Sequence, residues 1–213
     1  MGKKELKDLI KSLQDNKKVR KEVKQRIKEF QQNSQEDNKS WFNEICFCLL
    51  TANSSARKGI EIQDYLSRVD GFGQMSHEKL TETLKRMGHR FYKRRSEFIV
   101  EARKHQNIKD IVTRFKDENE TREWLVKNIK GIGYKEASHF LRNVGYHNVA
   151  ILDRHVLRVL NDHNLIDEVP KSLTPKKYKE IEKIVLELAK EMMVLPSELD
   201  LYLWYSKTGE VLK

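Results

Sequence analysis

Two residues in the second half of the chain, Lys135 and Asp153, have the types and positions that nucleophilic chemistry requires. Lys135 follows a glycine-rich turn and is predicted to lie in the first turn of a helix, where the helix dipole favours a neutral amine, which is a nucleophile. Asp153 follows an apolar run and precedes a helical stripe. Its carboxylate is therefore placed to cap a helix, to stabilise positive charge and to help deprotonate the amine. Each residue also has an ordinary interpretation, as a solvated surface lysine and a simple helix cap.

The turn before Lys135 predicts a helix–hairpin–helix motif, because the segments on either side of it carry apolar side chains at helical spacing. Gly131 and Gly133, which flank Ile132, permit backbone angles closed to other residues and let a bulky ligand approach the main chain. The N–H groups at the start of the second helix would then form a seat for a phosphate group. The alternative is an ordinary tight turn between two packed helices.

Helical periodicity dominates the rest of the sequence and predicts an all-α fold. Apolar residues recur every three or four positions within residues 19–30, 42–49, 80–87, 108–115 and 178–192. The predicted N-caps are Ser40, Ser76 and Thr174, and the predicted helix stops are Gly88 and Gly145. No convincing run of alternating β-branched residues indicates a strand.

The composition favours a polyanionic partner. The net charge is +10, from 42 Lys and Arg against 32 Asp and Glu, and basic surface gains affinity by releasing counterions from phosphates. Simple solubility or a heat-adapted surface explains the same charge. No apolar stretch suits a signal peptide or a membrane span, so we expect an intracellular protein. Cys46 and Cys48 lie in an apolar segment and are predicted to be reduced core residues, too few for a zinc or iron–sulfur site.

The segment from Ile129 to Asp153 resembles the helix–hairpin–helix DNA glycosylase superfamily, whose signature is a hairpin followed by a Gly/Pro-rich loop and an aspartate. In that superfamily the position of Lys135 holds lysine only in the enzymes that also cleave the DNA strand. The loop before Asp153 departs from the pattern because it lacks the usual proline. Residues 42–53, 88–93 and 200–213 narrow the resemblance to the archaeal-type 8-oxoguanine DNA glycosylase/AP lyase family.

This resemblance implies a base excision repair enzyme that acts on double-stranded DNA containing 8-oxoguanine or abasic sites. The damaged nucleotide would flip out of the duplex, and Lys135 would attack its C1′ atom and expel the base. A Schiff base and β-elimination would then break the strand, with Asp153 supporting charge at C1′. No metal or organic cofactor is implied, although in relatives the hairpin carbonyls hold an ion beside a phosphate. The expected state is a cytoplasmic monomer, associated with the nucleoid through DNA.

The resemblance also implies an architecture of two helical domains with a cleft between them, across which Lys135 and Asp153 face each other. Residues 53–147 would form the central domain with the hairpin. Residues 1–52 and 148–213 would form a discontinuous flanking domain that carries Asp153 and a C-terminal base-recognition segment.

Base recognition would need flat apolar walls and polar groups that read the oxidised edge. Phe91 and Trp204 are the predicted walls, and each could instead be a core residue. In the family that this chain resembles, the chain ends in lysine and its C-terminal group reaches the base pocket, which implies that role for Lys213. Asn53 and Arg90 are further predicted DNA contacts.

Two alternatives remain open at the level of sequence. One is an endonuclease III-like glycosylase for another oxidised base, although that branch usually carries a four-cysteine cluster that two cysteines cannot supply. The other is a non-enzymatic helix–hairpin–helix DNA-binding module, which Lys135 and Asp153 argue against.

Overall fold

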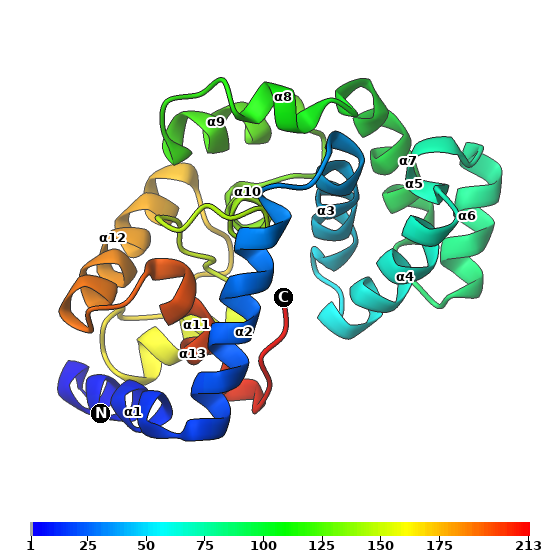
Figure 1. Cartoon of the computed structure of the whole chain (residues 1–213). Helices are drawn as coiled ribbons and strands as arrows, with labels where there is room; N and C mark the ends of the chain where they lie inside the picture. The colour runs from blue at the N-terminus through cyan, green and yellow to red at the C-terminus, as the bar shows by residue number, and fades with distance from the viewer. Residues whose placement is uncertain (1) are drawn as a thin grey trace. The chain divides into compact units, whose positions relative to one another are not determined.

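The chain folds into helices throughout the part that the structure describes. A computed structural model covers residues 2–213, and within this range it contains α-helices and one short 3-10 helix but no strand (Figure 1). The all-α prediction is therefore confirmed.

The helices form two compact units. Unit 1 combines the residues up to Gln32 with Gly145–Lys213, and unit 2 is Asn33–Val144. This division differs from the sequence-based one, which assigns residues 33–52 to the flanking domain and 145–147 to the central one. The reason is helix α3 (Asn38–Thr51), which packs against five other helices of unit 2.

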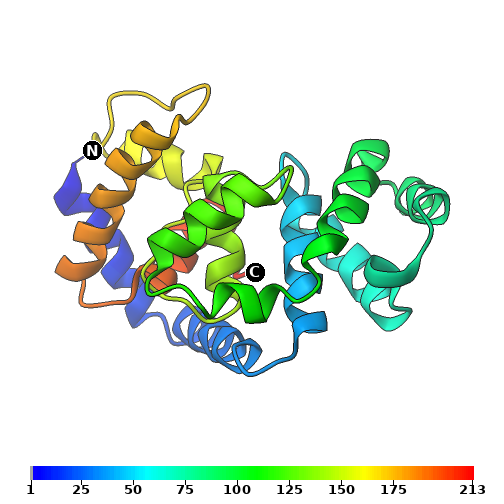
Figure 2. The same ribbon diagram turned by 90° about the horizontal axis from the view of Figure 1, so that it is seen from above.

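Unit 1 is built around a buried C-terminal helix. Its helices are α1 (Lys3–Asp15), α2 (Lys17–Asn33), α11 (Arg154–Asp162), α12 (Pro175–Glu191) and α13 (Pro196–Thr208). Helices α1, α11 and α12 pack against α13 (Figure 1). Figure 2 shows α1 and α12 side by side from above. Val19, Val23 and Phe30 of α2 form a buried cluster with Leu201 and Tyr202 of α13. Burial of these apolar side chains fixes α13, on which Trp204 lies.

Unit 2 is built around α3, whose side chains from Trp41 to Thr51 are buried at every position except Asn43. Helices that are apolar on all sides lie in a core. Around it lie α4 (Ala56–Arg68), α5 (Gly71–Gln74), α6 (His77–Arg86), α7 (Tyr92–Ala102), η1 (Arg103–His105), α8 (Ile108–Val112), α9 (Glu118–Asn128) and α10 (Tyr134–Asn143). Cys46 and Cys48 are buried within α3 and are not joined in a disulfide, as predicted.

Local capping explains where the helices begin. Ser76 and Thr174 accept hydrogen bonds from Lys79 and Lys177 as predicted. The prediction for Ser40 is wrong, because Asp37 caps α3 and accepts the Ser40 backbone N–H at 2.8 Å. That hydrogen bond lowers the pKa of Asp37. A carboxylate three residues upstream was therefore the stronger cap.

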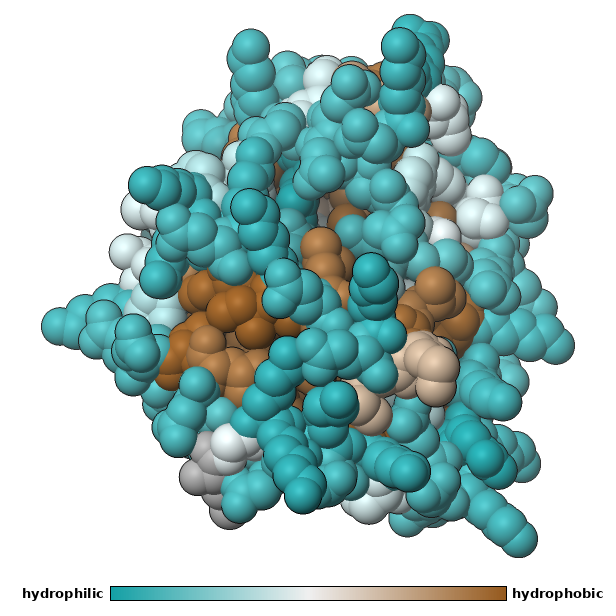
Figure 3. All heavy atoms as spheres, turned by 90° about the vertical axis from the view of Figure 1, so that its left-hand side faces the viewer, coloured by the Kyte–Doolittle hydropathy of each residue, from teal (hydrophilic) through white to brown (hydrophobic). Residues whose placement is uncertain are grey.

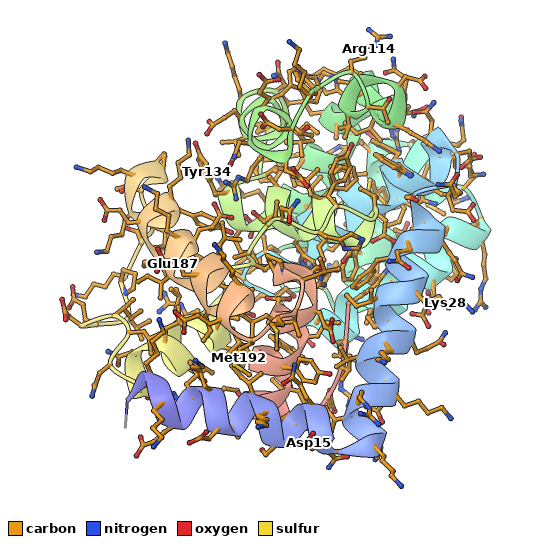
Figure 4. The ribbon with its side chains drawn as sticks, turned by 60° about the vertical axis from the view of Figure 1, so that its left-hand side comes forward. Asp15, Lys28, Arg114, Tyr134, Glu187 and Met192 are labelled. Atoms are coloured by element: carbon orange, nitrogen blue, oxygen red, sulfur yellow. The ribbon has the colours of Figure 1, made fainter. Side chains whose placement is uncertain are left out.

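Hydrophilic residues cover most of the face shown in Figure 3 and surround a hydrophobic patch. Lys28 of α2 is exposed, and it is labelled in Figure 4. Among the described residues, no helix has both the length and the apolar character that crossing a membrane requires.

Candidate active site

The predicted helix–hairpin–helix is present in unit 2. Helix α9 ends at Asn128 and α10 begins at Tyr134, and the Ile132 N–H donates to the Ile129 carbonyl at 3.1 Å across the turn. Ile129 and Ile132 are buried, so their side chains anchor the hairpin in the hydrophobic core. Gly133 is the N-cap of α10.

Gly131 occupies a position that only glycine fits. Its φ is +90°, in the left-handed region that side chains rarely adopt. A Cβ atom there would lie 2.3 Å from Cδ2 of Phe98 and 3.0 Å from Cδ2 of Leu49. The backbone conformation and the close packing therefore both require glycine at this position.

Lys135 lies in the first turn of α10, as predicted, with a side chain that is 23% exposed. Its Nζ atom is 3.9 Å from Oε1 of Glu136. The preceding residue, Tyr134 (labelled in Figure 4), donates its hydroxyl to Glu123 of α9 at 2.6 Å. Burial, with the Glu123 carboxylate beside it, raises the pKa of Tyr134 to about 12. This bond ties the start of α10 to the helix before the hairpin.

A pocket of about 430 Å³ in unit 2 brings together three of the predicted site residues, Asn53, Phe91 and Gly131. Its other lining residues are Ala52, Arg94, Arg95, Phe98, Lys130 and Glu136. The pocket thus combines aromatic rings with cationic side chains, a mixture that suits nucleic acid.

Arg95 is a buried residue in the lining of this pocket, and it is not among the site residues predicted from sequence. The side chain is buried, its Nη2 donates to the Ala52 carbonyl at 2.6 Å, and its Nε has no hydrogen-bond partner. Burial lowers the pKa of the guanidinium, an effect that the charge of Glu136 opposes. Arg95 also lies 5.8 Å from the Phe91 ring centroid, and Arg90 lies 5.0 Å from the same ring. Only the fold reveals that one arginine among several basic neighbours is buried.

Asp153 lies in unit 1 and caps α11, as predicted. Its Oδ1 accepts the backbone N–H groups of His155 and Val156, both at 2.8 Å. Its Oδ2 accepts the indole N–H of Trp204 at 3.1 Å. The rings of Trp204 and His155 also pack in a T-shaped arrangement, with centroids 5.7 Å apart and planes at 71°. Two predicted site residues of unit 1 are therefore joined directly.

The segment after α13 carries Lys213 and is tied to unit 1. Gly209 ends the helix with a φ of +71°, and the Thr208 hydroxyl accepts the Glu210 N–H at 3.3 Å. Val211 packs against the cluster formed by α2 and α13. Lys213 itself is partly buried.

Comparison with known proteins identifies the fold and then the family. Residues 23–194 match the family model described as 8-oxoguanine DNA glycosylase. The 8-oxoguanine DNA glycosylase/AP lyase of Methanocaldococcus jannaschii is 53% identical over 207 residues, which cover 96% of this chain and 99% of that protein. The Thermotoga maritima protein of the same name is 43% identical over 212 residues, covering 97% and 99%.

Solved structures of related proteins support the same family assignment. The crystal structure of the M. jannaschii 8-oxoguanine glycosylase/lyase with a 15mer DNA containing 8-oxoguanine matches with a TM-score of 0.95 at 52% identity, covering 98% of this chain and 99% of that chain. The T. maritima 8-oxoguanine DNA glycosylase matches with a TM-score of 0.90 at 43% identity, covering 98% and 100%. The fold is therefore that of a helix–hairpin–helix DNA glycosylase. The chain belongs to the 8-oxoguanine DNA glycosylase family.

The geometry of the hairpin turn generates a stability prediction. We expect Gly131→Ala to lower the free energy of unfolding by about 3 kcal/mol, because left-handed strain adds to the overlap with Phe98. Urea denaturation followed by circular dichroism measures this change. Gly88→Ala is the matched control, since Gly88 has a φ of +76° and open space around its Cβ direction. Equal losses in the two variants would contradict the packing argument.

Proposed function

We propose that this chain is a bifunctional DNA repair enzyme that excises 8-oxoguanine and then cleaves the strand as an AP lyase. The observation that carries the proposal is the Lys135 side chain, only 23% exposed, in the first turn of the hairpin's second helix. Membership of the 8-oxoguanine DNA glycosylase family supports the choice of lesion.

The proposed reaction begins with the lesion flipped out of the duplex, because the sugar carbon C1′ is not accessible in the stack. The lone pair of the Lys135 amine forms a bond to C1′ as the bond between C1′ and the base breaks. The base leaves with the electron pair of the broken bond and takes up a proton. Opening of the sugar ring gives a Schiff base. Loss of a C2′ proton then breaks the C3′–O bond by β-elimination, and water releases the lysine.

Asp153 supports this reaction electrostatically in our proposal. Its Oδ1 is held by two backbone N–H groups and its Oδ2 by Trp204, so the carboxylate is fixed before substrate binds. A preorganised negative charge stabilises positive charge that develops at C1′ without further rearrangement. It also serves as an acceptor for a proton from the attacking amine.

The hairpin and the aromatic residues would bind the DNA. Gly131, Ile132 and Gly133 would present the start of α10 to a backbone phosphate, which fixes position without reading sequence. Phe91 and Trp204 are the proposed walls for the extruded base, with Lys213 reading its edge. Asn53 and Arg90, both exposed, are proposed to be further contacts to the DNA.

The proposed substrates are double-stranded DNA with 8-oxoguanine and DNA with abasic sites. We also propose that the protein acts as a monomer in the cytoplasm, associated with the nucleoid through its substrate.

Borohydride reduction of the Schiff base tests the proposed function. We expect the native protein to become covalently trapped on duplex DNA containing 8-oxoguanine, and we expect Lys135→Gln to give no trapped complex because it lacks the amine. Lys127→Gln is the matched control, since Lys127 lies on the helix before the hairpin, is exposed and does not line the pocket. Equal trapping by Lys135→Gln and the native protein would show that another amine forms the Schiff base and would contradict the proposed role of Lys135.

Substitutions of Asp153 separate its capping role from its chemical one. Asparagine caps helices about as well as aspartate, but its amide NH2 cannot accept the Trp204 N–H, so Asp153→Asn should lower the free energy of unfolding by about 1 kcal/mol through the loss of that one hydrogen bond. The loss of charge should still slow single-turnover base excision by about 100-fold. Asp153→Ala should cost about 1 kcal/mol in addition, from the lost cap. A native excision rate in Asp153→Asn would show that the residue is a cap alone.

A further inference from the structure

Glu136 makes two contacts at the start of α10 that the proposed reaction does not yet use. Its Oε2 accepts the Gly133 backbone N–H at 3.3 Å, which closes a capping box around the hairpin turn. Its Oε1 is the atom that lies 3.9 Å from Nζ of Lys135. The Glu136 side chain is 16% exposed, so this carboxylate is shielded from water more than a surface acid would be.

The contact with Lys135 is not a routine helical ion pair. Adjacent residues on a helix point about 100° apart and do not face each other, whereas helical ion pairs normally join positions three or four apart. The carboxylate reaches Nζ because it folds back toward Gly133 to cap the helix. The carboxylate that caps the helix is therefore also the one beside the lysine amine.

The surroundings of Glu136 hold its carboxylate in one place. A Cβ atom on Gly133 would lie only 3.2 Å from Oε2, so the turn closely approaches the carboxylate. The buried guanidinium of Arg95 attracts it from the pocket side. Both the hairpin backbone and the pocket thus fix the group that contacts the amine.

We propose that Glu136 is a positioning residue for the Lys135 nucleophile, with one oxygen anchored by the hairpin backbone and the other restraining the amine that lies 3.9 Å from it. This inference rests on the proposed function of Lys135. The charge of Glu136 restricts the amine to the orientation from which it attacks. Misplacing a reacting group by about 1 Å is enough to cost about 100-fold in rate, so an unrestrained lysine side chain should react more slowly.

The test compares Glu136→Gln with the native enzyme under single-turnover conditions, with 8-oxoguanine duplex saturated by excess enzyme. Glutamine still accepts the Gly133 N–H through its amide oxygen, so the cap remains. We expect the melting temperature to stay within about 2 °C of the native value. We also expect unchanged affinity for duplex DNA containing a tetrahydrofuran abasic-site analogue. The rate of Schiff-base formation, measured by borohydride trapping, should fall by about tenfold.

Glu101→Gln is the matched control, because it removes one negative charge beside the other hairpin lysine, Lys130, at an ion-pair distance of 3.2 Å. We expect a native rate in this variant. A general effect of hairpin charge would instead slow both variants alike, and that result would overturn the proposal.

Glu136→Ala distinguishes positioning from capping. It removes both contacts, so its melting temperature should fall by about 3 °C while its rate matches that of Glu136→Gln. A native rate in Glu136→Gln with a loss only in Glu136→Ala would show that Glu136 is a cap and would overturn the proposal. If the native enzyme itself forms no trapped complex, both the proposed function of Lys135 and the role of Glu136 are contradicted. A trapped native complex together with a native rate in Glu136→Gln contradicts only the role of Glu136.

Discussion

The geometry of the site depends on the backbone turn at Gly131. The residue has a left-handed φ and lies against Phe98 and Leu49 with no room for a side chain. Its position fixes where α10 begins, and the first turn of α10 carries Lys135. A nucleophile is effective only when its reacting atom is held in place, so a rigid turn is a direct contribution to chemistry. The buried core of unit 2, built on α3, supplies that rigidity.

Two carboxylates, one in each unit, combine an observed capping role with the chemical role that we propose for them. Asp153 caps α11 through one oxygen and accepts the Trp204 indole N–H through the other. Glu136 caps α10 and contacts Lys135. In both cases the helix start orients the carboxylate before any ligand arrives, which is how preorganised electrostatic groups avoid reorganisation during a reaction. Capping and catalysis are therefore complementary interpretations of the same residues.

Much of this was predictable from sequence, because the determinants are local. The hairpin follows from its glycines between two apolar helical stripes, and the Asp153 cap follows from an acid immediately before such a stripe. Features that depend on tertiary packing were not predictable. The burial of Arg95 among several basic residues, and the assignment of α3 to unit 2, require knowledge of which helix faces meet. Ser40 failed as a cap because Asp37 offered a better acceptor three residues earlier.

The central claim is that the Lys135 amine becomes covalently bonded to deoxyribose. The most direct measurement is peptide mapping by mass spectrometry of the borohydride-reduced complex after nuclease and protease digestion. The account predicts that the sugar remnant is found on the peptide containing Lys135, which the protease should then fail to cleave after that residue. A remnant located on Lys130, on Lys213 or on the N-terminal amine would contradict it.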